Sequence, residues 1–234
     1  MIYITGDTHG YNDFDKIIQF FKNTKDKVTK NDYLIILGDV ACYFDNEFGD
    51  EYVQGLLHNL PCTVLWIDGN HENFNLINKL PITNMFCGKV QVCQKYPDII
   101  HLMRGQVYTI EGKKFFTFGG GLSIDKARRI EGKSWWKDEM PSNEEYQNGF
   151  DNLEFNDWEV DYILTHTAPN FICKQLVNFM YKGEEELQGY FDKIATNTTF
   201  TKWFFGHWHK DREIGDYMAM YHKVIKLTES FDEQ

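Results

Sequence analysis

The sequence predicts an α/β protein built around a parallel sheet that is covered by helices on both faces. Two observations lead to this fold class. Short apolar runs typical of buried strands alternate along the chain with amphipathic stretches of helical period. Strand–helix–strand order of this kind is typical of parallel sheets, whose connecting helices cover both faces.

The elements follow from these patterns in chain order, and the run YLIIL at 33–37 is the clearest buried strand. The first eighty residues are predicted to form strand 2–5, helix 13–22, strand 33–37, helix 47–57, strand 63–67 and helix 73–80. Short strands then follow at 99–103, 106–110 and 114–118, with a tight turn at Glu111-Gly112-Lys113. The remainder is predicted as a helix near 143–155, a strand at 162–164, helices around 170–181 and 184–194, a strand at 202–205 and one or two hairpins over 212–227.

The chain is expected to form one domain over 1–234, because it contains no repeat, low-complexity region or linker. No apolar run approaches the ~20 residues that span a membrane, and the start lacks the features of a signal peptide. The five cysteines form no C-x-x-C pair, which favours reduced thiols. We therefore expect a soluble cytoplasmic protein; the sequence gives no indication of its oligomeric state.

The charge is acidic overall but unevenly distributed. A net charge of −11 argues against binding to an extended nucleic acid, which depends on Lys and Arg. Residues 113–137 nevertheless carry a local net charge of +5, whereas 138–161 hold nine acids and no Lys or Arg. These segments are either two solvated faces or a basic loop near an anionic substrate.

Several predicted strands end in a side chain that can bind a metal ion. Four of these ends combine a glycine with such a residue: Gly6-Asp7, Gly38-Asp39, Gly69-Asn70 and Gly206-His207. A fifth strand end brings His166. Because the carboxyl ends of parallel strands form the ligand-binding edge of a sheet, and glycine lets the chain turn sharply there, these side chains should converge.

Two more histidines belong to the same set. His9 follows Asp7, and His209 follows His207, by two residues, so each pair can share a face of an extended segment. The candidate metal ligands are then Asp7, His9, Asp39, Asn70, His166, His207 and His209. Nitrogen and oxygen ligands without thiolate favour manganese, with iron, zinc, nickel or cobalt as alternatives. Seven ligands are too many for one such ion, so we expect two divalent ions that share a carboxylate.

The ordered motifs resemble the calcineurin-like metallophosphoesterase superfamily. They are GDTHG (6–10), GDV (38–40), GNHEN (69–73), THT (165–167) and GHWH (206–209). The segment GGGLSIDKARRIEGKSWW (119–136) is similar to a segment of small bacterial and phage-type members. The resemblance implies two mixed β-sheets packed as a sandwich, flanked by helices, and metal-dependent hydrolysis of phosphate esters.

The resemblance also implies roles for single residues. It assigns Asp7, His9, Asp39 and His209 to one metal ion, and Asp39, Asn70, His166 and His207 to the other. It places His71 over the leaving-group oxygen, as a general acid or transition-state stabiliser. Two divalent ions with two carboxylates would leave a charge of about +2 for a bridging hydroxide and a phosphate.

The second motif departs from the superfamily pattern. Many members continue it as G-D-x-x-D-R, in which the Asp orients the catalytic His and the Arg holds phosphate. Here Val40-Ala41-Cys42-Tyr43 follows Asp39 and supplies neither residue. Asp45 or Glu72 are the candidates for orienting His71, and Arg104 or Arg128 for contacting phosphate.

This departure favours a substrate with less charge. A phosphodiester carries one negative charge and a phosphomonoester two, and Tyr43 offers no cation in place of the arginine. We therefore predict a small nucleotide-like phosphodiester, with phosphomonoester hydrolysis by a protein or nucleotide phosphatase as the alternative. A scaffold that has lost catalysis and binds a partner is a further hypothesis, which the complete ligand set disfavours.

Two other motifs in the sequence are incomplete. Ser123-Ile124-Asp125-Lys126 matches S-x-x-K without the accompanying elements of serine acyl transferases, and Gly119–Gly121 lacks the continuation of a P-loop.

Overall fold

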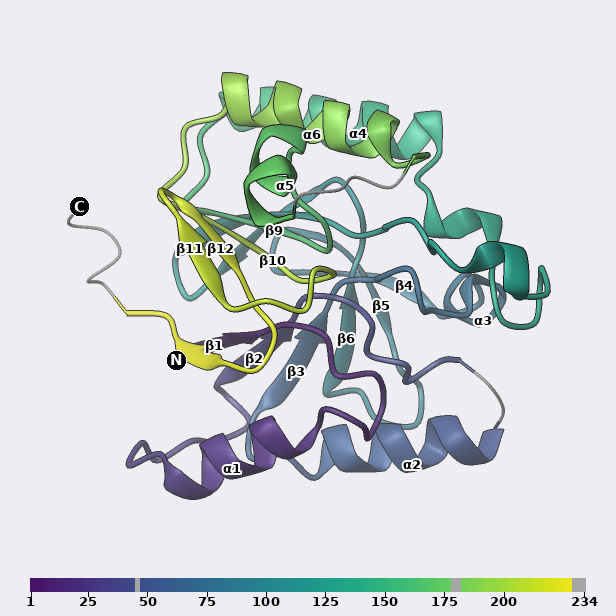
Figure 1. The fold of residues 1–234 in the computed structure, drawn as a ribbon. Helices are drawn as coiled ribbons and strands as arrows, with labels where there is room; N and C mark the ends of the chain where they lie inside the picture. The colour runs from purple at the N-terminus through teal and green to yellow at the C-terminus, as the bar shows by residue number, and fades with distance from the viewer. Residues whose placement is uncertain (45–46, 178–181, 229–234) are drawn as a thin grey trace.

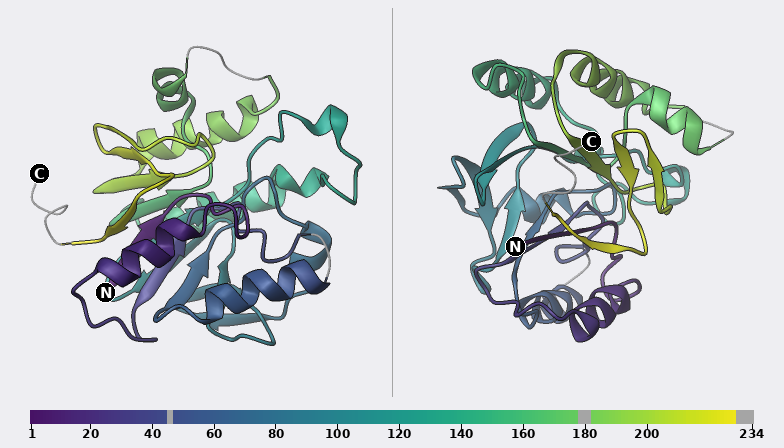
Figure 2. Two further views of the ribbon diagram at one scale, coloured as in Figure 1. Left: turned by 60° about the horizontal axis from the view of Figure 1, so that its bottom comes forward. Right: turned by 90° about the vertical axis from the view of Figure 1, so that its left-hand side faces the viewer.

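Two β-sheets lie face to face between two layers of helices in the computed structural model, which describes residues 1–44, 47–177 and 182–228 (Figure 1). Seven strands form one sheet, in the order β13-β1-β2-β3-β6-β5-β4, and six form the other, in the order β11-β12-β10-β9-β8-β7. The right-hand view in Figure 2 shows the same layers from the side. This arrangement confirms the sandwich of two mixed sheets flanked by helices.

The central strands of each sheet are parallel, and the edges are antiparallel. The seven-stranded sheet comprises β1 (Ile2–Thr5), β2 (Tyr33–Ile36), β3 (Thr63–Trp66), β4 (Ile82–Met85), β5 (Gly88–Val92), β6 (Ile99–Leu102) and β13 (Val224–Lys226). The six-stranded sheet comprises β7 (Gln106–Ile110), β8 (Lys113–Phe118), β9 (Tyr162–Thr165), β10 (Lys202–Phe205), β11 (Arg212–Ile214) and β12 (Tyr217–Ala219).

Apart from the short α3 (Phe74–Ile77), which lies at the right-hand edge of Figure 1, the described helices divide between the two outer layers. Those of the outer layers are α1 (Asp15–Asn23), α2 (Glu47–His58), α4 (Asn143–Phe155), α5 (Asn170–Leu176) and α6 (Glu185–Asn197). In Figure 1, α1 and α2 run along the bottom, beneath the seven-stranded sheet, and α4, α5 and α6 lie above the six-stranded sheet. Ser142 and Glu145 form a reciprocal capping box that fixes the start of α4. None of the described helices is long and apolar enough to cross a membrane.

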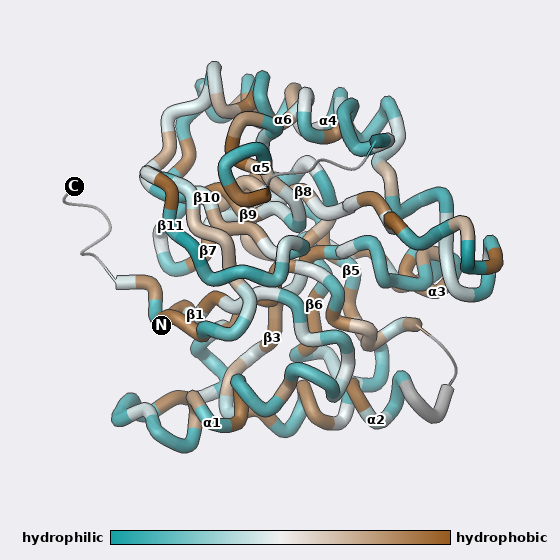
Figure 3. Tube along the Cα trace, in the orientation of Figure 1, coloured by the Kyte–Doolittle hydropathy of each residue, from teal (hydrophilic) through white to brown (hydrophobic). Residues whose placement is uncertain are grey.

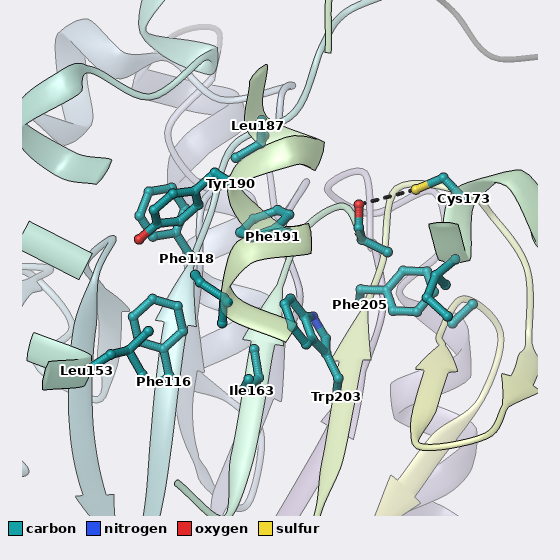
Figure 4. Close-up of a cluster of buried hydrophobic side chains, with 14 of the residues drawn as sticks. Phe116, Phe118, Leu153, Ile163, Cys173, Leu187, Tyr190, Phe191, Trp203 and Phe205 are labelled. Atoms are coloured by element: carbon teal, nitrogen blue, oxygen red, sulfur yellow. Dashed lines mark hydrogen bonds between the residues drawn. The ribbon is translucent and has the colours of Figure 1, made fainter. Parts of the chain in front are cut away.

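Three apolar layers hold the sandwich together, because the parallel strands are buried on both faces. Successive strand residues point to opposite faces, so Phe115 packs between the sheets whereas Phe116 packs under the helices. Figure 4 shows this outer layer, where Trp203 and Phe205 of β10 lie near Phe191 of α6. The hydropathy-coloured trace in Figure 3 shows hydrophobic stretches along the strands and hydrophilic positions on the helices. The strands of both sheets are thereby fixed relative to one another.

The predicted elements differ from the observed ones in a few places. The turn expected over 111–113 is a two-residue loop, since Glu111 and Gly112 have positive φ and Lys113 already pairs with Ile110. The helix expected over 170–181 ends at Leu176, because Val177 takes an extended conformation; residues 178–181 lie outside the described part of the chain. The β4–β5 hairpin was not predicted from the sequence.

Candidate metal centre

The carboxyl ends of the parallel strands meet at one edge of the sandwich. Asp7, Asp39 and Asn70 follow β1, β2 and β3 of the seven-stranded sheet. His166 and His207 follow β9 and β10 of the six-stranded sheet. The main-chain N–H of His207 donates to Asp7 Oδ1 at 3.0 Å. The two sheets therefore contribute side chains to a single site.

One group of side chains gathers around Asp7. Candidate ligand atoms of Asp7, His9 and His209 all lie within 4.8 Å of one another. His209 Nε2 is 3.3 Å from Asp7 Oδ2, and His9 Nε2 is 3.5 Å from Asp39 Oδ2. These distances bring together the residues that the sequence analysis placed on the first ion.

A second group gathers around Asn70. Its Oδ1 atom lies 2.9 Å from His207 Nδ1 and 3.1 Å from His166 Nε2. His166 Nε2 is also 3.6 Å from Asp39 Oδ1. The two oxygens of Asp39 thus face different groups, Oδ2 toward His9 and Oδ1 toward His166. Asp39 occupies the position expected of a carboxylate shared by both.

The backbone is unusual at four of the seven candidate positions. Left-handed φ angles, rare for residues other than glycine, occur at His9 (44°), Asp39 (50°), His207 (66°) and His209 (48°). Such conformations are unfavourable and persist where the surrounding structure holds them, most often at functional sites. Their concentration here indicates that the placement of these side chains costs the chain some stability.

Two glycines permit the close approach of neighbouring strand ends. A Cβ atom on Gly38, which has a φ of +94°, would lie 2.1 Å from His166 Nδ1. A Cβ atom on Gly69 would lie 2.1 Å from Asp39 Oδ1. Any larger residue would displace the candidate ligand beside it, which explains the glycine in the sequence motifs.

The two carboxylates are held in their charged form. Burial alone would raise the pKa of Asp39, but the charge of His166 and a hydrogen bond with His9 lower this pKa below its ordinary value. For Asp7, burial acts in the same direction, and the hydrogen bond with His209 and the charge of His166 lower the pKa. Two buried carboxylates that remain ionised at neutral pH make the site attractive to cations.

A family model for calcineurin-like phosphoesterases matches residues 1–211. The chain belongs to the calcineurin-like phosphoesterase family. It is therefore a metal-dependent phosphoesterase of a family that typically uses a dinuclear centre of divalent ions and acts on phosphate esters. No curated protein shows significant similarity to the sequence.

Solved structures agree with the fold of this phosphoesterase. Phosphopantetheinyl hydrolase from Mycobacterium tuberculosis is 16% identical, with a TM-score of 0.53 over 94% of this chain and 87% of that one. The TT1561 protein of Thermus thermophilus is 11% identical, with a TM-score of 0.50 over 94% of this chain and 87% of that one. At these identities the likeness establishes the shared fold.

The orientation of the histidines fits a metal centre. His9 Nδ1 lies 2.7 Å from Asp13 Oδ2, which leaves Nε2 to face Asp39. His166 Nδ1 lies 2.7 Å from the carbonyl oxygen of Leu37, which leaves Nε2 to face Asn70 and Asp39. Metal-binding histidines in proteins are held in this way, with one ring nitrogen on an acceptor and the other free for the ion.

Several supporting residues of the phosphoesterase could not be read from its motifs. Glu184 Oε1 lies 3.5 Å from His207 Nε2, and the ring of Tyr221 stacks on His209 with centroids 4.5 Å apart. Both come from distant parts of the chain, so no local pattern indicates them. Asp13, by contrast, follows His9 by four residues, a spacing that the sequence does display.

His71 lies at the edge of the two groups. Its backbone N–H donates to Asp39 Oδ1 at 2.8 Å, and burial lowers the pKa of its imidazole. No described side chain hydrogen-bonds to the ring. Glu72, predicted as one possible orienting residue, instead accepts from the Val40 N–H at 2.7 Å. Asp45, the other candidate, lies outside the described residues.

Neither arginine that was predicted to contact phosphate lines a cavity at the site. Arg104 is buried and donates from Nε and Nη2 to Asp68 Oδ2 at 2.8 and 2.6 Å, and it lines neither cavity at the site. Arg128 is exposed and also lines neither cavity. The contacts of Arg104 and Arg128 with phosphate therefore stay predictions. It is the next residue, Arg129, that shares a cavity with His9 and His71.

Two cavities of about 390 Å³ each open at the site, and His71 borders both. The first lies on the side of His207, Trp208 and Glu184. The second lies on the side of His9 and Arg129. Space for a substrate is therefore available on two sides of the candidate metal centre.

Proposed function

We propose that this protein binds two divalent metal ions with seven side chains and hydrolyses small phosphodiesters there. Asp7, His9, Asp39 and His209 would hold one ion, and Asp39, Asn70, His166 and His207 the other. The observation that carries this proposal is the position of Asp39, whose two oxygens face His9 and His166 separately. Manganese is the metal that we propose, because the donors are imidazole nitrogens and carboxylate or amide oxygens, without thiolate.

When bound, such ions would supply Lewis acidity and a water of lowered pKa. Neighbouring residues hold the candidate metal ligands in position. Asp13 and the Leu37 carbonyl hold the rings of His9 and His166, and Ser123 fixes the amide of Asn70 through a hydrogen bond of 3.2 Å from Nδ2 to Oγ. We assign His71 to the leaving-group oxygen, because no residue in the described part of the chain hydrogen-bonds to its ring and the residue borders both cavities.

The preference for a diester rests on charge and on space. Tyr43, which stands where many members carry the phosphate-binding arginine, packs its ring against Trp66, with centroids 6.2 Å apart. Arg104 is committed to Asp68. A monoanionic diester demands less of such a site than a dianionic monoester. Two cavities that meet at His71 also offer room for both organic groups of a diester.

Phosphomonoester hydrolysis is the second candidate, and Arg129 is the observation that favours it, because a cation beside His71 could support a dianion. The test compares kcat/KM for bis-p-nitrophenyl phosphate and p-nitrophenyl phosphate on the manganese-loaded protein. We expect the diester to be the better substrate. A clear preference for the monoester would favour the second candidate, and no turnover of either ester would favour a scaffold without catalysis.

A further inference from the structure

The second cavity at the site is formed by parts of the chain that the metal-binding motifs do not include. Its wall includes Tyr11 from the loop after β1, Tyr52 from α2, and Phe44 from the segment before α2. His9 and His71 form the side toward the candidate metal centre. A molecule with its phosphate at the metal centre could thus extend into this cavity without crossing the protein.

Two exposed tyrosines contribute to the wall of this cavity. Tyr11 and Tyr52 are 65% and 59% exposed, which is unusual for large aromatic side chains. The centroids of the two rings lie 6.2 Å apart in an edge-to-face arrangement. Neighbouring aromatic rings that remain open to solvent beside a catalytic centre are typical of surfaces that bind a planar group. Stacking on such rings tolerates many ring systems, since each of them has a π-face.

Arg129 supplies a positive charge in the wall of the same cavity. Its Nε donates to Asp125 Oδ1 at 2.7 Å, and its Nη1 donates to the carbonyl oxygen of Ser134 at 3.0 Å. Its Nη2 has no hydrogen-bond partner among the described residues, and the side chain is only 21% exposed. The guanidinium is thus held in place with one donor group available, which suits a single contact with an oxygen of a monoanionic phosphodiester rather than the bidentate contact that favours a dianion.

We propose that this cavity binds the organic group of the phosphate ester, that this group is a planar aromatic ring such as a nucleobase or aryl group, and that Arg129 contacts the phosphate. The ring would lie against Tyr11 and Tyr52 while the phosphate remains beside His9 and His71. This inference rests on the proposed function and specifies its substrate class. It also gives a physical reason for two exposed tyrosines at the rim of the site.

The experiment measures binding of two phosphonates to the manganese-loaded protein by calorimetry. Benzylphosphonate and methylphosphonate carry the same acid group, and only the first has a ring; neither has an ester bond to hydrolyse. We expect benzylphosphonate to bind about tenfold more tightly, the order of magnitude of one stacked ring. In the Tyr11→Ala/Tyr52→Ala variant, this ratio should fall to about one, while the Kd of methylphosphonate stays unchanged.

Phe155→Ala is the matched control, because Phe155 is also an exposed aromatic residue, 87% accessible, but lies on α4 away from the cavity. It should keep the full ratio. A wild-type protein that does not distinguish the two phosphonates, or a double variant that keeps the ratio, would overturn the proposal. Failure of the proposed function has a separate readout, the absence of diester hydrolysis, which binding of these phosphonates does not require.

Discussion

The Nδ1 atom of His9 lies 2.7 Å from the Oδ2 atom of Asp13, four residues further along the chain. The contact closes the loop between β1 and α1 and turns the other ring nitrogen of His9 toward Asp39. Asp13 belongs to none of the motifs that identify the family. It is nevertheless the residue that fixes the orientation of one candidate ligand.

The first prediction concerns this contact. Asp13→Asn should weaken manganese binding by roughly 10–100-fold, the usual effect of removing the partner of a metal-binding histidine. A competition titration with a metal-sensitive dye measures this. Asp15→Asn is the matched control, since Asp15 is a nearby exposed acid at the start of α1 and should leave the affinity unchanged. Equal affinity in the Asp13 variant and the wild type would remove the supporting role of Asp13.

The second prediction concerns His71. If His71 assists the leaving group, His71→Ala should keep both metal ions while kcat falls by roughly 10²–10⁴-fold. The loss should be smaller for a good leaving group such as p-nitrophenolate than for an alkyl alcohol, because the former needs less help to depart. Metal content and kcat are measured on the same preparation. Loss of one metal ion in this variant would make His71 a ligand instead.

The third prediction concerns the buried ion pair of Arg104 and Asp68. Arg104→Ala should lower the free energy of unfolding by about 3–5 kcal/mol, because the carboxylate of Asp68 would remain buried and, among the described residues, would keep only the contact with His101 Nε2 at 3.2 Å. Denaturant unfolding measures the loss. If the Arg104→Ala variant kept its stability but had a raised KM, Arg104 would be a substrate contact instead.

The fourth prediction separates two neighbouring arginines. Arg129→Ala should raise the Kd of both methylphosphonate and benzylphosphonate by a similar factor of about tenfold or more, because Arg129 would contact the acid group that they share. Arg128→Ala serves as the control and should bind both as the wild type does, because Arg128 is exposed and lies outside both cavities. If Arg128→Ala weakened binding of both phosphonates and Arg129→Ala did not, Arg128 would be the residue that contacts phosphate.

The sequence predicts most of the fold because the buried strands are short apolar runs, several of which end at a glycine. The β4–β5 hairpin is not predicted, for a physical reason. Ile82, Thr83 and Asn84 are exposed, so β4 shows no apolar pattern, and its turn at Phe86-Cys87 adopts positive φ without a glycine. The strands predicted over 212–227 are present as β11, β12 and β13, but only β11 and β12 pair as a hairpin, because β13 pairs with β1 of the other sheet.

The sequence also predicts which side chains meet at the strand ends, because parallel strands must end at one edge. It could not predict which arginine faces the site. The segment 122–136 contains only a short 3₁₀ turn, Lys126–Arg128, so no regular period tells which basic side chain points inward. Glu184 and Tyr221 likewise approach the site through tertiary packing alone.

Metal stoichiometry tests the central claim, that two divalent ions share Asp39, most directly. Wild-type protein, stripped by chelation and reloaded with manganese, should bind close to two ions per chain and regain phosphoesterase activity. Asp39→Asn should weaken the binding of both ions and lose more activity than a change at any ligand of a single ion. One ion per chain in the wild type, or full activity after exhaustive chelation, would contradict the account.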